Sequence, residues 1–261
     1  MAPSRDWPLV LAYHHVTPTR VTTRYAITAD DFERQLAGLL AQGFSAMSLH
    51  GAIDAGEFGS GACPPRTFTL TFDDGFASFR QFAEPVLARL GLLGATTVFV
   101  PTAFVGDRSD WIEEPSAGQR VTRASDFREP CMSWDDLARL AERGVCVGSH
   151  GHRHLPMNEL TYEDARSEAA ESHAALAAHG FDAAYLALPF GWASSECRRA
   201  VRDAGFDAAF AVERGGGDRY EIRRIPIYGG ESRAMVRLKL SGRYFGVHDA
   251  AARLVGRGRP R

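Results

Sequence analysis

The chain contains almost no lysine, and its cysteines are too widely spaced to form a known motif. Its 30 lysine and arginine residues include one lysine, Lys239, and none of its four cysteines belongs to a C-x-x-C pair. This spacing encodes neither a disulfide framework nor a thiolate zinc site. The formal charge of −2 argues against nucleic acid as a partner, because neutralising phosphates requires a basic surface.

Long apolar runs are also missing. The first residues lack an apolar stretch of signal-peptide length, and no later window is long enough to span a membrane. We therefore expect a cytoplasmic protein. The 261 residues suffice for one large core, and α/β barrels of this length are commonly single domains.

What the chain does contain is a repeated helix-strand pattern. An amphipathic stretch ends at a glycine and a short β-branched or aromatic run follows, at Gly43, Gly91, Gly144, Gly180 and Gly205. Glycine fits the left-handed position that ends a helix, and the short run fits a buried parallel strand. Capping boxes predict three helix starts, at Thr28 with Asp31, Ser133 with Asp136 and Thr161 with Asp164.

About eight candidate strands result, of which one is expected to be peripheral, and this number is enough to close a parallel barrel. They are Leu9–His14, Phe44–Leu49, Thr67–Phe72, Ala95–Val100, Val145–Ser149, Ala184–Pro189, Ala208–Val212 and Ile222–Ile227. We predict a single α/β domain, a barrel of seven or eight strands over residues 8–230. A basic C-terminal extension, 231–261, follows it.

Polar residues follow several of these strands at their carboxyl ends, where barrel enzymes assemble active sites. His14 ends the first strand, Asp73 and Asp74 end the third, His150 follows Val145–Ser149, and Pro189 follows Ala184–Leu188. Neighbouring strand residues face opposite ways, so both aspartates can serve one site only if the chain turns there. The following glycine permits that turn.

An aspartate with two histidines is a ligand set that leaves coordination positions open on a divalent metal, as catalysis requires. The second aspartate is then available as a general base. His150 and His154 are the expected ligands; His152 is the alternative, although it is expected to point away from both. Gly151 and Pro156 favour a loop around the metal over a regular helix. A ferrous oxygenase uses the same ligand types, but the spare carboxylate and the helix-strand alternation favour hydrolysis.

These motifs resemble those of the polysaccharide deacetylase (NodB homology) family, carbohydrate esterase family 4. The resemblance runs from about Pro8 to Ile227 and is carried by Thr71-Phe72-Asp73-Asp74-Gly75, Ser149-His150 with His154, Leu188-Pro189-Phe190-Gly191 and the opening Leu11-Ala12-Tyr13-His14-His15-Val16. It implies a distorted (β/α) barrel and metal-dependent removal of N-acetyl groups from amino sugars. Zinc is the default metal, with cobalt, nickel or manganese as alternatives.

The resemblance also assigns roles. It makes Asp73 the general base, and the implied metal ligands are Asp74, His150 and His154. Phe190, next to Pro189, would offer its backbone N–H to the oxyanion. Trp192, directly after this motif, either stacks on a sugar or packs within the protein.

Two departures from the family pattern affect the expected chemistry. Ala187 stands where an arginine usually holds the base aspartate, so we expect Asp73 either to have a raised pKa or to lean on another group. The usual C-terminal Leu-x-His is missing, since Leu238-Lys239-Leu240-Ser241 has no histidine. His14, as in family branches that open with Tyr-His, is the predicted general acid; its alternative is a core histidine bonded to backbone.

Three functions remain open. The first is removal of an N-acetyl group from an amino sugar, polymer or small glycoside, and the second is hydrolysis of a non-sugar amide or imine in cytoplasmic metabolism. The third, a non-catalytic sugar-binding protein, is disfavoured by the complete set of base and ligands.

The tail from Arg233 to Arg261 has eight basic residues against one acid, Asp249. It is either an outer helix with a basic end or a weak contact to an anionic membrane surface. The sequence leaves the oligomeric state open.

Overall fold

The computed structural model of the chain describes residues 8–19, 23–54, 64–109, 129–212 and 218–254. Its central element is a parallel sheet with the strand order β1-β10-β9-β8-β7-β6-β5-β4, in which β1 also pairs with β5 and so closes a barrel. The strands are β1 (Leu9–Tyr13), β4 (Ser45–Ala46), β5 (Thr67–Phe72), β6 (Thr96–Val100), β7 (Cys146–Ser149), β8 (Tyr185–Ala187), β9 (Ala208–Val212) and β10 (Ile222–Pro226).

All eight predicted strands are present, and the peripheral one is β4. It pairs through two residues with the first two residues of β5 and lies outside the closed ring. The fold is therefore a distorted (β/α) barrel in a single domain, as predicted. A short parallel pair, β2 (His15–Thr17) with β3 (Ala26–Thr28), follows β1 and was not anticipated.

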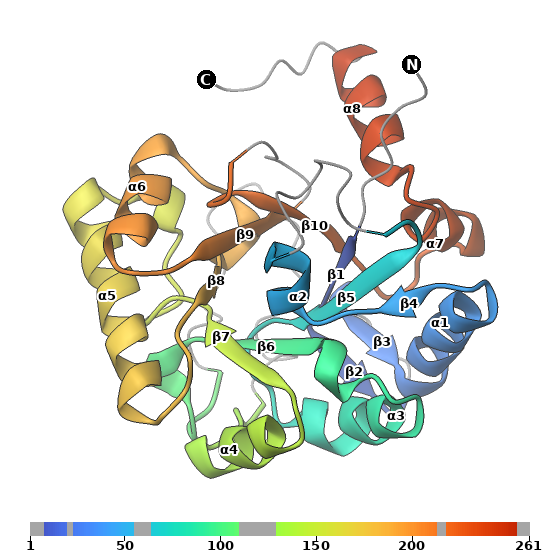
Figure 1. The fold of residues 1–261 in the computed structure, drawn as a ribbon, viewed down its shortest axis with the longest axis horizontal. Helices are drawn as coiled ribbons and strands as arrows, with labels where there is room; N and C mark the ends of the chain where they lie inside the picture. The colour runs from blue at the N-terminus through green and yellow to red at the C-terminus, as the bar shows by residue number, and fades with distance from the viewer. Residues whose placement is uncertain (1–7, 20–22, 55–63, 110–128, 213–217, 255–261) are drawn as a thin grey trace.

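The helices lie around the ring of strands, except that Leu49–Asp54 lies across its centre (Figure 1). They are α1 (Ala29–Ala41), α2 (Leu49–Asp54), α3 (Glu84–Arg89), α4 (Trp134–Glu142), α5 (Tyr162–Ala178), α6 (Ser195–Asp203), α7 (Arg233–Lys239) and α8 (Tyr244–Leu254). The three predicted helix starts are confirmed, because the Thr28, Ser133 and Thr161 side chains each accept a hydrogen bond from the backbone N–H three residues on. The five predicted helix-ending glycines all have positive φ.

Alternating strand residues divide the core into an inner and an outer part. Val10, Phe210 and Ile222 pack together inside the ring, where Leu49 of α2 joins them and closes one end. Their neighbours on the same strands face the helices; Leu9 and Leu11, for example, pack with α1 and α3 residues. Burial of both faces explains why the strands are apolar runs without polar alternation.

The described part of the C-terminal extension packs on the barrel. Lys239 is buried, donates to the Pro226 carbonyl at the end of β10 over 2.6 Å and pairs with Glu231. Tyr244 and Phe245 belong to the outer core. In the described residues, no helix combines the length and the apolar character that crossing a membrane requires.

Candidate active site

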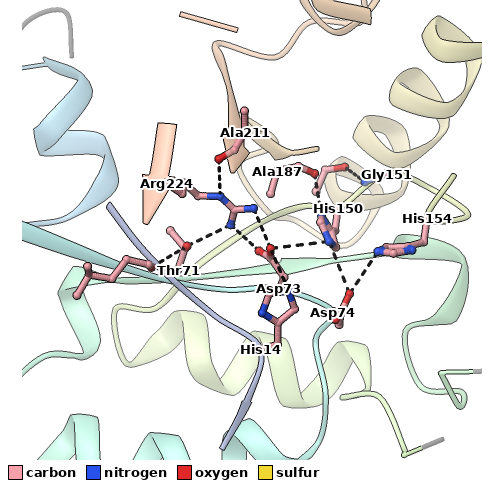
Figure 2. A network of polar contacts seen from close by, with 12 residues as sticks. His14, Thr71, Asp73, Asp74, His150, Gly151, His154, Ala187, Ala211 and Arg224 are labelled. Atoms are coloured by element: carbon pink, nitrogen blue, oxygen red, sulfur yellow. Dashed lines mark hydrogen bonds and ion pairs between the residues drawn. The ribbon is translucent and has the colours of Figure 1, made fainter. Parts of the chain in front are cut away.

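The two aspartates reach one site because the chain leaves the strand between them. The Asp73 backbone N–H donates to the Tyr13 carbonyl over 2.9 Å, and Asp74 and Gly75 then adopt positive φ of 71° and 65°. A side chain at Gly75 would place its Cβ 2.7 Å from Val100, so only glycine fits this turn. Both carboxylates are buried and point into the same space at the carboxyl ends of the strands (Figure 2).

His150 follows β7 and is oriented by a backbone carbonyl. Its Nδ1 lies 2.8 Å from the Ala187 carbonyl oxygen, which can only accept, so this nitrogen carries the proton. Burial lowers the pKa of His150 to about 4, and the ring is therefore neutral at pH 7. The lone pair of Nε2 faces the site, 3.6 Å from Asp74 Oδ1.

His154 completes a three-residue cluster. Its Nε2 lies 3.4 Å from Asp74 Oδ1, and one ligand atom from each of Asp74, His150 and His154 lies within 4.8 Å of the others. Burial alone would raise the pKa of Asp74, but the hydrogen bond and charge of His154 hold it well below the usual range. Two imidazole nitrogens and an ionised carboxylate are a donor set that suits a divalent cation such as zinc.

Asp73 is held separately, by an arginine from the next strand but one in the closed ring. The Arg224 guanidinium, on β10 and fully buried, donates to Asp73 Oδ1 over 2.6 Å and to Oδ2 over 2.8 Å. The same group also donates to the Thr71 hydroxyl over 3.1 Å and the Ala211 carbonyl over 3.4 Å. Burial by itself raises the pKa of Asp73, but the charge and hydrogen bond of Arg224 together with the nearby histidines outweigh it, and the pKa is lowered. Asp73 is therefore ionised.

His14 lies directly after β1, with Nε2 3.9 Å from Asp73 Oδ2. Burial lowers its pKa, and the charge of the nearby Asp73 carboxylate opposes that shift. Its Nδ1 is buried and makes no hydrogen bond to any described residue. Within the described ranges, Nδ1 therefore makes no backbone hydrogen bond of the kind that the alternative, a core histidine, would require.

Two further histidines of these motifs lie away from the cluster. His152 turns its Nδ1 to the Thr102 hydroxyl at 2.9 Å, and its Nε2 is 3.5 Å from Glu171. His15 faces the opposite side from His14; its Nδ1 is 3.0 Å from Glu129 and its ring stacks on Phe76.

The residues after β8 line the cluster from the side. Pro189, Phe190 and Gly191 form a single tight turn in which Phe190 has a φ of 62°. The Phe190 ring lies 5.1 Å from the His154 ring and is 55% exposed, and Trp192 is 43% exposed. Gly191 is required here, because a Cβ would approach Val212 to 2.5 Å. The turn beside the cluster thus carries one solvent-accessible aromatic side chain, Phe190, and a second, Trp192, directly follows it.

Sequence reasoning missed Arg224, although a signal was present. The strand Ile222–Ile227 contains two adjacent arginines, and adjacent strand residues face opposite ways. One of the two must point into the barrel, where an arginine requires a carboxylate partner. Arg223 takes the outer position and pairs with Asp249 of α8, which leaves Arg224 on the inside.

The fold and the cluster define an α/β-barrel protein with a candidate metal centre at the carboxyl ends of its strands. A family model described as polysaccharide deacetylase matches residues 60–209, more than half of the chain. The chain belongs to this family. It is 25% identical over 173 residues to the Bacillus subtilis (strain 168) protein named "Putative polysaccharide deacetylase YxkH". The match covers 62% of the chain and 52% of that relative, so the chain spans about half the length of the curated relative it matches.

Solved structures share the fold. The de-N-acetylase of Aggregatibacter actinomycetemcomitans superposes with a TM-score of 0.69 at 19% identity, over 88% of this chain and 98% of that one. IcaB of Ammonifex degensii superposes with a TM-score of 0.70 at 22% identity, over 90% and 95%. The Streptococcus pyogenes deacetylase PplD gives 0.66 at 18%, over 86% and 93%. At these identities the likeness concerns the barrel alone.

The pairing of Arg224 with Asp73 generates a stability prediction. Arg224→Met should lower the free energy of unfolding of the metal-free protein by about 3–5 kcal/mol, because it leaves a buried carboxylate without its cation. Adding Asp73→Asn removes the uncompensated charge, so the double variant should be more stable than Arg224→Met alone. Urea unfolding of wild type, both single variants and the double variant measures this. Additive losses would show that the two side chains are not coupled.

Proposed function

We propose that the protein is a metal-dependent hydrolase that removes the acetyl group from an N-acetylated amino sugar, in a polysaccharide or a small glycoside. One observation carries the proposal: a cluster of Asp74, His150 and His154 lies beside a second, separately held carboxylate, Asp73. Membership of the polysaccharide deacetylase family supports the amino-sugar substrate. A cytoplasmic location and a weak membrane contact through the basic tail stay predictions.

In this proposal Asp74, His150 and His154 hold a divalent cation, zinc by preference. When bound, such a cation supplies Lewis acidity that polarises the acetyl carbonyl and acidifies water. The division between the two aspartates follows from their partners. Asp74 faces both histidines, whereas the oxygens of Asp73 are engaged by Arg224.

Asp73 is proposed as the general base. Arg224 fixes its orientation and keeps it ionised, so it is ready to accept a proton from the water that attacks the amide carbon. As charge builds on the carbonyl oxygen, the Phe190 backbone N–H is proposed to stabilise it; one such donor is typically worth about 3–4 kcal/mol. Phe190 and Trp192 are proposed to contact the sugar, with Pro189 setting the turn that presents them.

His14 is proposed to protonate the departing amine. Its Nε2 lies 3.9 Å from Asp73 Oδ2, so an imidazole stands next to the proposed base. Arg224 supplies the cation beside Asp73 that position 187 lacks, so Ala187 gives no reason to favour a non-sugar substrate. Cleavage of metabolite amides is therefore tested as an alternative outcome.

Acetate release tests the function directly. Purified protein should release acetate from N-acetylglucosamine oligomers, lose this activity after treatment with a chelator and recover it with added zinc, because the cluster alone supplies no Lewis acid. Cobalt, nickel and manganese are compared in the same assay to identify the preferred metal. Release from amides of small metabolites, with none from sugars, would replace the substrate class. No release from any acetylated compound would favour a binding protein.

The two aspartates should separate in their effects. Asp73→Asn should keep stoichiometric zinc while lowering kcat by about 10²–10⁴-fold, the range for loss of a general base. Asp74→Asn should lose zinc, since it removes the only carboxylate of the three-residue cluster. Elemental analysis combined with acetate release distinguishes the two, and His152→Ala serves as a control that retains zinc. Equal loss of zinc in both aspartate variants contradicts the assignment.

His14 should matter most when the leaving group is poor. His14→Ala should bind zinc normally, lose the alkaline limb of the pH–rate profile and be strongly impaired on the amide. The limb is expected because a general acid stops working once the pH exceeds its pKa. An activated acetate ester needs no proton on its leaving group, so its hydrolysis should be far less affected. Equal losses on amide and ester, with the pH profile unchanged, would show that His14 is not the acid.

A further inference from the structure

The loop that carries both histidines of the cluster adopts an unusual backbone conformation. Gly151 and His154 have positive φ of 77° and 58°, and only glycine adopts this region without steric cost. His154 contributes its ring to the cluster from this conformation. Contacts elsewhere must therefore hold the loop in place.

The first half of the loop is held by the last residue of β7 and by the turn that follows β6. The Gly151 N–H donates to the Ser149 hydroxyl over 3.0 Å, and the Gly151 carbonyl accepts from the Thr102 N–H over 3.2 Å. The His152 carbonyl accepts from the Ala103 N–H over 2.9 Å. These contacts end before Arg153, the residue that directly precedes His154.

The second half is held by a carboxylate of α5. Glu168 is fully buried; one of its oxygens accepts the Arg153 backbone N–H, and the other accepts Arg153 Nε over 3.1 Å. The Arg153 side chain itself is 54% exposed. The buried part of this interaction is therefore the hydrogen bond from the Arg153 backbone N–H to the Glu168 carboxylate.

Glu168 is the charged residue among the buried residues of α5. The other buried residues of α5 are Ala165, Ala169, Ser172 and Leu176, none of them charged. A buried carboxylate is costly unless it is paired, and packing at this position requires no charge. The cost is offset where the two oxygens fix the Arg153 backbone and side chain at once.

We propose that Glu168 is a positioning residue for the candidate metal centre. By holding Arg153, it sets His154 in its left-handed conformation before a metal binds, so that the ring already faces Asp74. This inference rests on the proposed function for the metal site and extends it to a residue that does not touch the cluster. Residues of this kind change metal affinity by about 10–100-fold when they are altered.

Glu168→Gln tests the proposal, with Glu171→Gln as the matched control. Glutamine keeps the volume, but its amide group would face the Arg153 Nε donor with another donor, so one contact is lost together with the charge. Glu171 lies three residues further along the same helix and contacts the same loop through the His152 side chain. The zinc dissociation constant of the metal-free protein, measured by competition with a chromogenic chelator, is the readout, and thermal unfolding of the metal-free protein is recorded beside it.

We expect zinc binding to weaken by about tenfold or more in Glu168→Gln and to stay at the wild-type level in Glu171→Gln. A smaller loss in Glu168→Gln, with or without a lower Tm, overturns the proposal, as does an equal loss in the control. If Glu168→Gln fails to fold, Glu168→Asp is judged by the same criterion, because it keeps the charge but is too short to reach both donors. Wild-type protein without zinc affinity would contradict the proposed function instead.

Discussion

The organisation of the site depends on a buried ion pair between Asp73 and Arg224. Arg224 is fully buried on β10 and donates to both oxygens of an aspartate that follows β5. Neither charge is tolerable alone in the barrel interior, because an unpaired buried charge costs several kcal/mol. The pair therefore links two strands that do not hydrogen-bond to each other, β5 and β10, and keeps one carboxylate ionised. Asp74 is left to face the histidines, and this separation gives two adjacent aspartates different environments.

Backbone strain is concentrated in the same place. Among the described residues, the non-glycine residues with positive φ are Arg66, Asp74, His154 and Phe190, and the last three surround the site. Left-handed backbone costs a non-glycine residue about 1–2 kcal/mol, and such residues persist where neighbouring contacts hold them. Each of the three has such a neighbour. Gly75, packed against Val100, follows Asp74; Arg153, held by the Glu168 carboxylate, precedes His154; and Gly191, packed against Val212, follows Phe190. Asp74 and His154 face each other across the site from these backbone conformations.

The family pattern usually has an arginine at the position of Ala187 on β8, where it would pair with Asp73. In this chain another strand supplies that cation. Ala187 has no charge to offer, yet its carbonyl oxygen orients His150 through a 2.8 Å hydrogen bond. The cation that balances Asp73 comes instead from β10, which lies two strands away from β8 in the barrel order. Inside a closed barrel, side chains from non-adjacent strands meet at the axis. The same ion pair can therefore form from either strand.

Local signals in the chain were sufficient for the strands, the helix starts, the helix-ending glycines and the grouping of polar residues at one end of the barrel. These features depend on residues close in sequence: a cap and its partner three positions on, or an apolar run ended by a glycine. The pairing of Arg224 with Asp73, the carbonyl partner of His150 and the hold of Glu168 on the histidine loop were decided only by tertiary structure. Each joins residues at least 15 positions apart, and pattern alone cannot say which inward-facing side chains meet once the barrel closes.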